Sequence, residues 1–269
     1  MIAVRAGSLA TLKLLYRVYA KSTLTLAGAN MWSPLHEAAS SGNASITDWM
    51  LKEGASAAAL NAMWEMPLHI AARQGHLAVC QLLHMRHPAA SVYPSRTSKE
   101  MPMHQAALNG QFHVVTWMAS LPSAQLQAKT QAGQTVLDTV IHTTFSSCRS
   151  YTSLQQADAK EQRVCFERQQ LQCIGLLSGN APAPSVTFQM LACASGTSNV
   201  HIVLHLLQQG ADPNYRTNPA EQAALHRAAL APNASPMRLL LKAGAKTTGQ
   251  SIALACQMVQ IPSAMPYVT

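Results

Sequence analysis

The sequence predicts an all-α repeat array, in which each unit is a helix, a glycine break, a second helix and a loop. Three observations lead to this prediction. The 269-residue chain is 48% hydrophobic but only 5% aromatic, and it is rich in Ala, Leu, Gln and Met, which favours helices over a sandwich or barrel. A seven-residue block recurs with its histidines 33 and then 35 residues apart. A glycine follows each of these histidines after six residues, and an apolar stretch comes next.

The repeated block is clearest in the first half of the chain. The copies read S-P-L-H-E-A-A at 33–39, M-P-L-H-I-A-A at 66–72 and M-P-M-H-Q-A-A at 101–107, and the apolar stretches follow at 46–51, 79–83 and 114–118. Weaker copies begin at Thr135, Thr187 and Ala223, so six units can be counted.

Residue chemistry explains where the first helix of each unit begins. The Ser33 hydroxyl can cap free N–H groups of the helix. Pro34, Pro67 and Pro102 suit the first helical turn, where a missing N–H costs nothing. The paired alanines keep this helix thin, so neighbouring units can approach closely, while Leu and Val of the second helix bury against the next unit.

These motifs resemble the ankyrin-repeat family, whose consensus runs T-P-L-H-x-A-A-x-x-G, then an apolar helix ending L-L, then G-A-D-x-N. Residues 208–214 (Q-Q-G-A-D-P-N) match the last part. The resemblance implies a solenoid of stacked antiparallel helix pairs with short β-hairpin fingers, acting as a protein–protein interaction scaffold or adaptor. The blocks are also similar to substrate receptors of the ankyrin-repeat and SOCS-box family, which implies a ubiquitin-ligase role, although no SOCS-box helix set is visible after Gly249.

The expected domain organisation is a single array over residues 1–262. Its parts are a partial first repeat (1–30), repeats at 31–63, 64–98, 99–131, 132–180, 184–217 and 218–247, a partial last repeat (248–262) and a tail (263–269). The repeat at 132–180 exceeds one period, so we expect an insertion near 143–165 and a long second helix over 154–177. Because the chain starts and stops within a repeat, we expect either that it is a fragment or that its terminal repeats are degenerate caps.

The net charge of +8 is concentrated at the two ends of the chain. Four basic residues and no acid precede Glu37, and the same is true after Glu221. This distribution does not describe a uniform nucleic-acid groove, but binding of nucleic acid or an anionic surface through the basic terminal repeats stays open as an alternative. The basic N-terminal segment fits either a degenerate first repeat or a mitochondrial presequence.

Several other function classes are disfavoured. No apolar run is long enough for a membrane span. No nucleophile elbow, phosphate-binding loop or paired-carboxylate signature is present, so no enzyme and no cofactor are predicted. His84 and His87, or His201 and His205, have helical spacing but lack a matching Cys or carboxylate, so no metal site is predicted. Six irregularly spaced cysteines favour a reducing compartment, which predicts a cytoplasmic or nuclear protein. We also expect the protein to be a monomer.

The resemblance also implies where a protein partner binds: on the fingers, on the residue before each helix cap and on the variable positions before each glycine. The residues at these positions include Trp32, Ser41, Trp64, Glu65, Arg73, Gln74, Glu100, Leu108 and Asn109. Tryptophan is enriched at interface hot spots. Trp32 and Trp64 therefore either bind the partner or pack on a neighbouring finger, and both interpretations are open.

Overall fold

The computed structural model describes residues 4, 7–19, 28–143, 156–178, 190–192, 194–195, 199–214, 224–230 and 234–246. It forms two compact units, unit 1 over Met1–Leu177 and unit 2 over Ser178–Thr269. The described secondary structure is helical, as predicted. The single array over 1–262 stays a prediction, and the partial last repeat (248–262) and the tail (263–269) lie outside the described residues.

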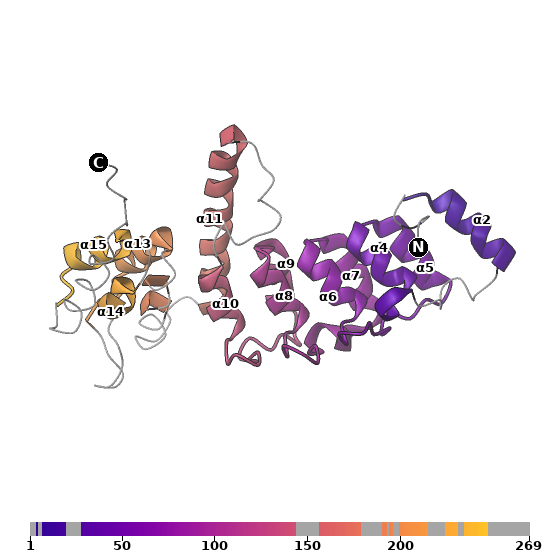
Figure 1. Cartoon of the computed structure of the whole chain (residues 1–269), viewed down its shortest axis with the longest axis horizontal. Coiled ribbons are helices and arrows are strands. Elements are labelled where there is room, and N and C mark those ends of the chain that lie inside the picture. Colours follow the sequence, from indigo (N-terminus) through magenta and orange to yellow (C-terminus); the bar gives the residue numbers. More distant parts are fainter. Residues whose placement is uncertain are drawn as a thin grey trace, which may run out of the picture. The chain divides into compact units, whose positions relative to one another are not determined.

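Unit 1 is built from α-helices in pairs. The helices are α2 (Leu9–Tyr19), α4 (Pro34–Ser41), α5 (Ala44–Lys52), α6 (Pro67–Gln74), α7 (Leu77–Arg86), α8 (Pro102–Leu108), α9 (Phe112–Ala119), α10 (Val136–His142) and α11 (Gln156–Ser178), with short 3-10 turns at Ala29–Met31 and Pro88–Val92. The inner helices α4, α6, α8 and α10 pack in a row, and α5, α7 and α9 form a second row against them (Figure 1).

The inner helices begin where the sequence predicts. Ser33 caps α4, since its side chain accepts a hydrogen bond from the His36 N–H, and Pro34, Pro67 and Pro102 occupy the first helical position. Methionine precedes α6 and α8 and has no oxygen that could accept from a free helix N–H. The histidine bond is the same as in α4: Nδ1 of His69 accepts from the Met66 N–H at 3.1 Å, and Nδ1 of His36 accepts from the Ser33 N–H at 3.2 Å.

The core lies between the two rows of helices. The paired alanines of α4, α6 and α8 are fully buried, together with Ile46 and Met50 of α5 and Val79 and Leu83 of α7. This confirms that the small residues allow close approach. Gly42, which ends α4, has a φ of +72°, and a Cβ placed there would lie 2.6 Å from the ring of His76 in the next repeat.

Helix α11 is the long second helix expected over 154–177, and Figure 1 shows it extending well beyond its neighbours. The Phe166 ring packs on Phe112 of α9, with ring centroids 5.0 Å apart. The buried Gln170 side chain donates to the carbonyls of Val140 and Thr143. Helix α11 begins within the range 143–165 in which an insertion is predicted, and that insertion stays a prediction; residues 144–155 lie outside the described part of the chain.

Unit 2 contains α13 (Val200–Gln208), α14 (Ala224–Ala229) and α15 (Ser235–Lys242). Leu206, Leu225 and Leu240 are buried in it. The Asn that ends the G-A-D-P-N motif joins consecutive repeats: the Asn214 amide donates to the Gly244 carbonyl at 3.0 Å and accepts from the Lys246 N–H at 2.7 Å.

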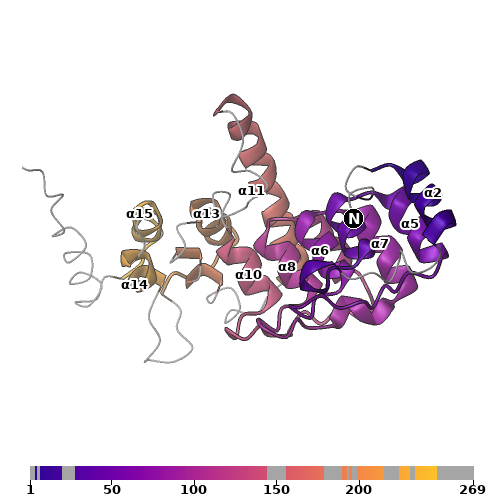
Figure 2. The same ribbon diagram turned by 45° about the vertical axis from the view of Figure 1, so that its right-hand side comes forward.

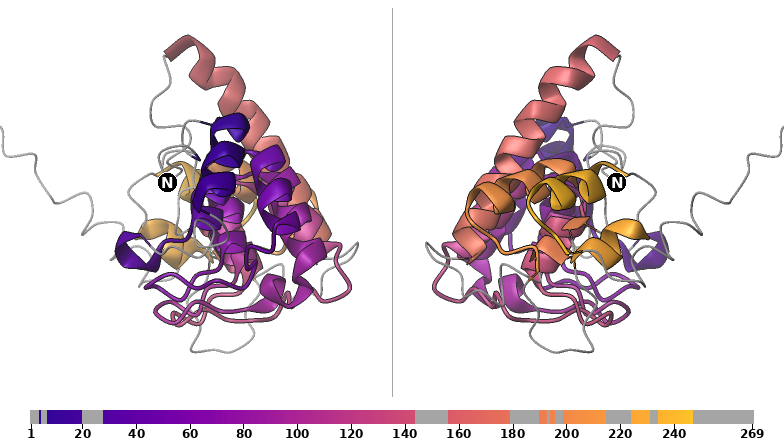
Figure 3. Two further views of the ribbon diagram at one scale, coloured as in Figure 1. Left: turned by 90° about the vertical axis from the view of Figure 1, so that its right-hand side faces the viewer. Right: turned by 90° about the vertical axis from the view of Figure 1, so that its left-hand side faces the viewer.

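The predicted β-hairpin fingers require a correction. The segments that connect the repeats of unit 1 gather along one edge, below the helices (Figures 2 and 3). Within the described residues these segments form turns, and no strand is present. The backbone hydrogen bonds within each segment are short-range, such as those from the Asn61 N–H to Glu65 and from the Trp64 N–H to Asn61, and they close a tight turn without pairing two strands.

Candidate functional site

Four fingers of unit 1 form the edge on which the candidate site lies. We define them as finger 1 (28–33), finger 2 (55–66), finger 3 (92–101) and finger 4 (121–135). The residue before each helix cap accepts the hydrogen bond that closes the turn: Trp32 from the Gly28 N–H, Glu65 from Asn61, Glu100 from Ser95 and Gln134 from Thr130. The four turns therefore share one geometry, although finger 3 has one extra residue.

In every finger, the residue two positions before the helix cap has a left-handed backbone conformation. Its φ is +57° at Met31, +60° at Trp64, +52° at Lys99 and +76° at Gly133. Only one of these four is the glycine that this conformation favours. Three fingers therefore hold a large side chain at a position where the backbone conformation costs free energy.

The two tryptophans singled out by the sequence differ in their surroundings. The Trp32 indole donates to Oε2 of Glu37 at 3.0 Å and packs on the His36 ring, so it is half-buried within its own repeat. Trp64 is 43% exposed on finger 2, and the Arg96 guanidinium of finger 3 lies 4.8 Å from its ring centre. Trp64 is therefore the more exposed of the two tryptophans.

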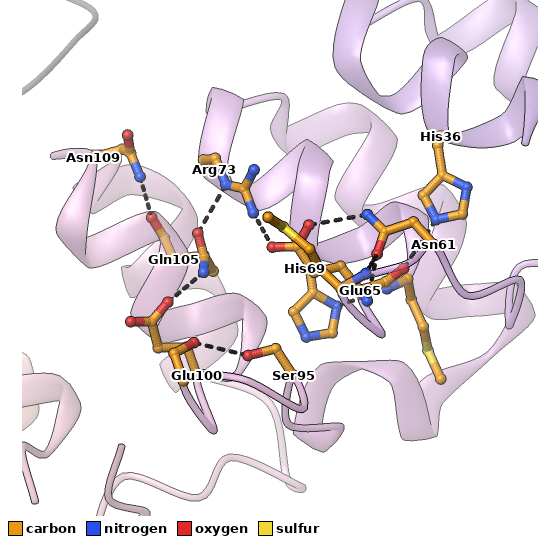
Figure 4. Close-up of polar contacts among 12 residues, drawn as sticks. His36, Asn61, Glu65, His69, Arg73, Ser95, Glu100, Gln105 and Asn109 are labelled. Atoms are coloured by element: carbon orange, nitrogen blue, oxygen red, sulfur yellow. Dashed lines mark hydrogen bonds and ion pairs between the residues drawn. The ribbon is translucent and has the colours of Figure 1, made fainter. Parts of the chain in front are cut away.

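A polar network lies behind the fingers and joins consecutive repeats (Figure 4). Glu65 is 3% exposed, so the expectation that it lies on the accessible surface is wrong. Its carboxylate accepts from the Asn61 amide at 3.0 Å and forms an ion pair with Arg73 of α6. Nε of Arg73 also donates to the side chain of Gln105, 32 residues later, at 2.8 Å. The buried carboxylate is thus paired and hydrogen-bonded, as burial of a charge requires.

The same network reaches finger 3. The Gln105 amide donates to the Glu100 carboxylate, and the Asn109 amide donates to the Gln105 backbone carbonyl at 2.9 Å. The structure therefore brings Glu65, Arg73, Glu100 and Asn109 together through Gln105 (Figure 4). These side chains are half-buried or buried, and they connect fingers 2 and 3 to α6 and α8.

The remaining predicted residues lie at the ends of the inner helices. Ser41, Gln74 and Leu108 are exposed at the ends of α4, α6 and α8. Together with Trp64 they are the accessible members of the predicted set.

The motif histidines hold the fingers from the helix side. In His69, Nδ1 accepts a backbone N–H, so the ring proton sits on Nε2, which donates to the Tyr93 carbonyl of finger 3 at 3.0 Å. His36 makes the equivalent bond to the Glu65 carbonyl at 3.0 Å. Burial lowers the pKa of His69 to about 4, and it lowers the pKa of His36 and His104 as well. These imidazoles are neutral structural groups.

Sequence reasoning missed three residues of this site: Asn61, Arg96 and Gln105. Asn61 occupies a turn, and Gln105 stands at a variable position of the repeated block. Arg96 carried a usable signal, because it is a cation among the small and polar residues Pro94, Ser95, Thr97 and Ser98.

Within the described ranges, no group of three potential metal-ligating side chains lies together. His84 instead bonds the Ser91 hydroxyl, with 2.7 Å between Nδ1 and Oγ. The helices of the described ranges are also too short or too polar to cross a membrane.

Comparisons with known proteins agree with this architecture. Residues 1–94 match the family described as ankyrin repeats, in three copies. The crystal structure of the human ASB11 ankyrin repeat domain is similar, with a TM-score of 0.65 and 21% sequence identity over 91% of this chain and 97% of that domain. None of the curated proteins matches the sequence.

Proposed function

We propose that the chain binds a protein partner through the fingers of unit 1. Residues 1–94 match ankyrin repeats and the chain has the ankyrin-repeat fold, which is a protein–protein interaction architecture. The proposed interface adds the exposed inner-helix residues Ser41, Gln74 and Leu108 to the fingers. We further propose that the chain is a monomeric scaffold or adaptor that catalyses no reaction of its own.

The observation that carries the proposal is the position of Trp64. An indole exposed at a finger tip gives up the hydrophobic stabilisation that burial would supply. The left-handed backbone at Trp64 adds a conformational cost that glycine would avoid. Unfavourable backbone geometry of this kind persists at functional sites, and tryptophan is the residue most enriched in interface hot spots.

The polar network supports the same proposal. Binding is weakened when loops must become ordered in the complex, and fixing them beforehand reduces that cost. Arg73 joins Glu65 of finger 2 to Gln105 of α8, and Gln105 joins Glu100 of finger 3. The fingers that carry Trp64 and Arg96 are therefore held in place before a partner arrives.

An affinity-capture experiment tests the proposal. Wild-type protein, Trp64→Ala and Trp32→Ala are used as baits in parallel, after circular dichroism shows that all three are folded. Met85→Ala is the matched control, since Met85 is 68% exposed on the outer helix α7. We expect Trp64→Ala to reduce specific partners by about tenfold, which corresponds to a hot-spot loss of 1.4 kcal/mol or more. Met85→Ala should leave capture unchanged, and equal capture by Trp64→Ala and wild type would refute the proposed interface.

A finer proposal concerns the cellular role. The similarity of the repeated blocks to ankyrin-repeat and SOCS-box substrate receptors supports a role in presenting a partner to a ubiquitin ligase. The test is whether the level of a captured partner rises when the chain is depleted and is restored by wild type but not by Trp64→Ala. If the level of the partner does not change on depletion, the ligase role is refuted, while the proposed binding function still stands.

We also propose that the chain acts in the cytoplasm or the nucleus. Cys80, Cys165 and Cys173 are free thiols, which is what a reducing compartment maintains. Burial raises the pKa of the Cys80 and Cys173 thiols to about 12, so these two are protected from reaction by packing. Imaging of a fluorescent fusion, with cell fractionation, tests this location.

A further inference from the structure

The fingers of unit 1 have an uneven charge. Arg96, Lys99 and Lys129 are exposed on fingers 3 and 4, and Glu65 and Glu100 are the only acidic residues in the four fingers. Arg73 offsets the buried Glu65 in an ion pair. Glu100 faces the Gln105 amide, so its carboxylate is directed at α8. The accessible part of the fingers is therefore positively charged.

These cations have no carboxylate partner within the described ranges. The ion pairs found there join Lys52 to Asp48, Arg73 to Glu65 and Arg163 to Glu167. Arg96 lies over the Trp64 ring, an arrangement that leaves the outer side of the guanidinium available to an anion.

The fingers join into one continuous surface. The Ala62 N–H of finger 2 donates to the Asn30 carbonyl of finger 1 at 2.8 Å. Arg96 of finger 3 covers Trp64 of finger 2. The Gln131 N–H of finger 4 donates to the Ser98 carbonyl of finger 3 at 2.8 Å. The apolar and the basic side chains are therefore presented on adjacent, connected turns.

The apolar part of this surface is on fingers 1 and 2. Met31 is 59% exposed on finger 1, Met63 is 58% exposed on finger 2, and Trp64 directly follows Met63 in the chain. Methionine is flexible and polarisable, so it adapts to the side chains of a bound peptide. The finger surface, defined by Met31, Met63, Trp64, Arg96, Lys99 and Lys129, thus has an apolar half and a basic half.

We infer that the finger surface binds an acidic peptide segment of the partner, one that carries a large apolar side chain next to its carboxylates. The apolar side chain lies against Met31, Met63 and Trp64, and the carboxylates pair with Arg96, Lys99 and Lys129. The inference rests on the proposed function and adds the chemical class of the partner. Charge complementarity supplies orientation and rapid association, while the apolar contact supplies affinity.

A peptide fits this surface better than a nucleic acid does. Single-stranded nucleic acids bind where a basic groove accompanies several aromatic platforms on which successive bases stack. The finger surface has one exposed indole, and its other apolar residues are two methionines. Thioethers accommodate aliphatic and aromatic side chains but provide no flat stacking face.

Peptide selection with the whole chain tests the inference directly. A phage-displayed library of random peptides is selected on wild-type protein, and one enriched peptide is synthesised with a fluorescent label. We expect enrichment of Asp and Glu beside an aromatic or large aliphatic residue. In anisotropy titrations, the triple variant Arg96→Glu, Lys99→Glu, Lys129→Glu should weaken binding by roughly tenfold or more. Raising the salt from about 50 to about 300 mM should also weaken it.

A matched triple variant in unit 2 controls for net charge. Arg238→Glu, Lys242→Glu and Lys246→Glu reverse the same number of exposed cations, at residues that belong to none of the four fingers. This control should bind the peptide within about twofold of wild type, a difference of less than 0.5 kcal/mol. It also tests binding through the basic terminal repeats, which predicts an equal or larger loss from this variant. Circular dichroism and thermal unfolding establish that both triple variants are folded.

Distinct results would overturn the inference. Enriched peptides without acidic residues that still lose binding in Trp64→Ala would refute the acidic partner and leave the proposed interface in place. Peptides insensitive both to Trp64→Ala and to the finger triple would refute the interface as well. Failure to enrich any peptide would also refute the inference. So would a single-stranded RNA of about 20 nucleotides that displaces the selected peptide at a lower concentration than the unlabelled peptide does.

Discussion

The Nε2 atom of His69 lies 3.0 Å from the backbone carbonyl oxygen of Tyr93, so a histidine that begins one inner helix fixes the finger of the next repeat. The ring of His69 also meets the Tyr93 ring edge to face, with centroids 6.5 Å apart. Protonation of Nδ1 would break the bond that it accepts from the Met66 N–H. The position of finger 3 against α6 therefore depends on the neutral form of the buried His69 imidazole.

Stability should fall as the pH is lowered through the range in which His69 titrates. The folded-state pKa is about 4, below the ordinary value of 6.5, so the unfolded chain binds the proton first and unfolding is favoured below pH 6.5. This single group should remove roughly 2 kcal/mol between pH 7.5 and pH 5, and the loss should level off below pH 4. His36 and His104 shift in the same direction. Urea unfolding at several pH values measures the effect.

His69→Gln tests the assignment of this pH dependence. The variant should be less stable at pH 7.5, because Gln does not fill the buried site, but its stability should change less between pH 7.5 and pH 5. His113→Gln is the control, since His113 is exposed. A pH dependence that is the same in His69→Gln and in wild type would contradict the role of His69.

Trp64→Gly and Trp64→Ala should differ in stability although both remove the indole. Trp64 has a φ of +60°, which glycine adopts readily and alanine does not. We expect Trp64→Gly to be more stable than Trp64→Ala by roughly 0.5 to 1 kcal/mol, after allowing for the greater freedom of glycine in the unfolded chain. Thermal and urea unfolding measure this difference. Ala62→Gly, two residues earlier and outside the left-handed region, should instead lose stability.

The close approach of Gly42 to His76 predicts an unusually sensitive glycine. Gly42→Ala places a Cβ against an imidazole ring that bonds the Ser40 carbonyl, with 3.1 Å between Nε2 and the oxygen. Gly54→Ala is the matched control, because Gly54 has a φ of +93° and no atom within 4 Å of an added Cβ. Both variants lose the left-handed preference of glycine, but Gly42→Ala should be less stable by a further 1 kcal/mol or so. Equal losses in urea unfolding would mean that the ring moves aside freely.

Removal of Arg73 should expose the cost of burying Glu65. Arg73→Met leaves a buried carboxylate with one amide donor, Asn61, but no cation, and we expect a loss of roughly 2 kcal/mol in the free energy of unfolding. Glu65→Gln in the same chain should recover part of this loss, which a double-mutant cycle measures. Lys52→Met breaks an exposed pair with Asp48 and should cost less than about 0.5 kcal/mol. Additive losses at Glu65 and Arg73 would show that the two are not coupled.

Local features of the chain could be predicted from the sequence because their causes lie within a few residues. The helix starts at Pro34, Pro67 and Pro102 follow from the cap and the ring of proline, and the buried alanine pairs follow from the repeat period. The long helix α11 follows from a run of helix-forming residues that contains no proline and a single glycine, Gly175. For the candidate site, the same reasoning selected Trp64 and Arg73 by their place in the repeat.

Contacts between repeats were decided by the tertiary structure. Glu65 and Trp64 are adjacent in the chain, yet one is buried beside Arg73 and the other is exposed beneath Arg96. Their different environments depend on Arg73, on Gln105 and on Arg96, which come from later segments of the chain. The sequence by itself determined the repeats and their helices, because capping and periodicity are local. Only the tertiary structure decided which finger residues are accessible, since burial is a property of the whole stack of repeats.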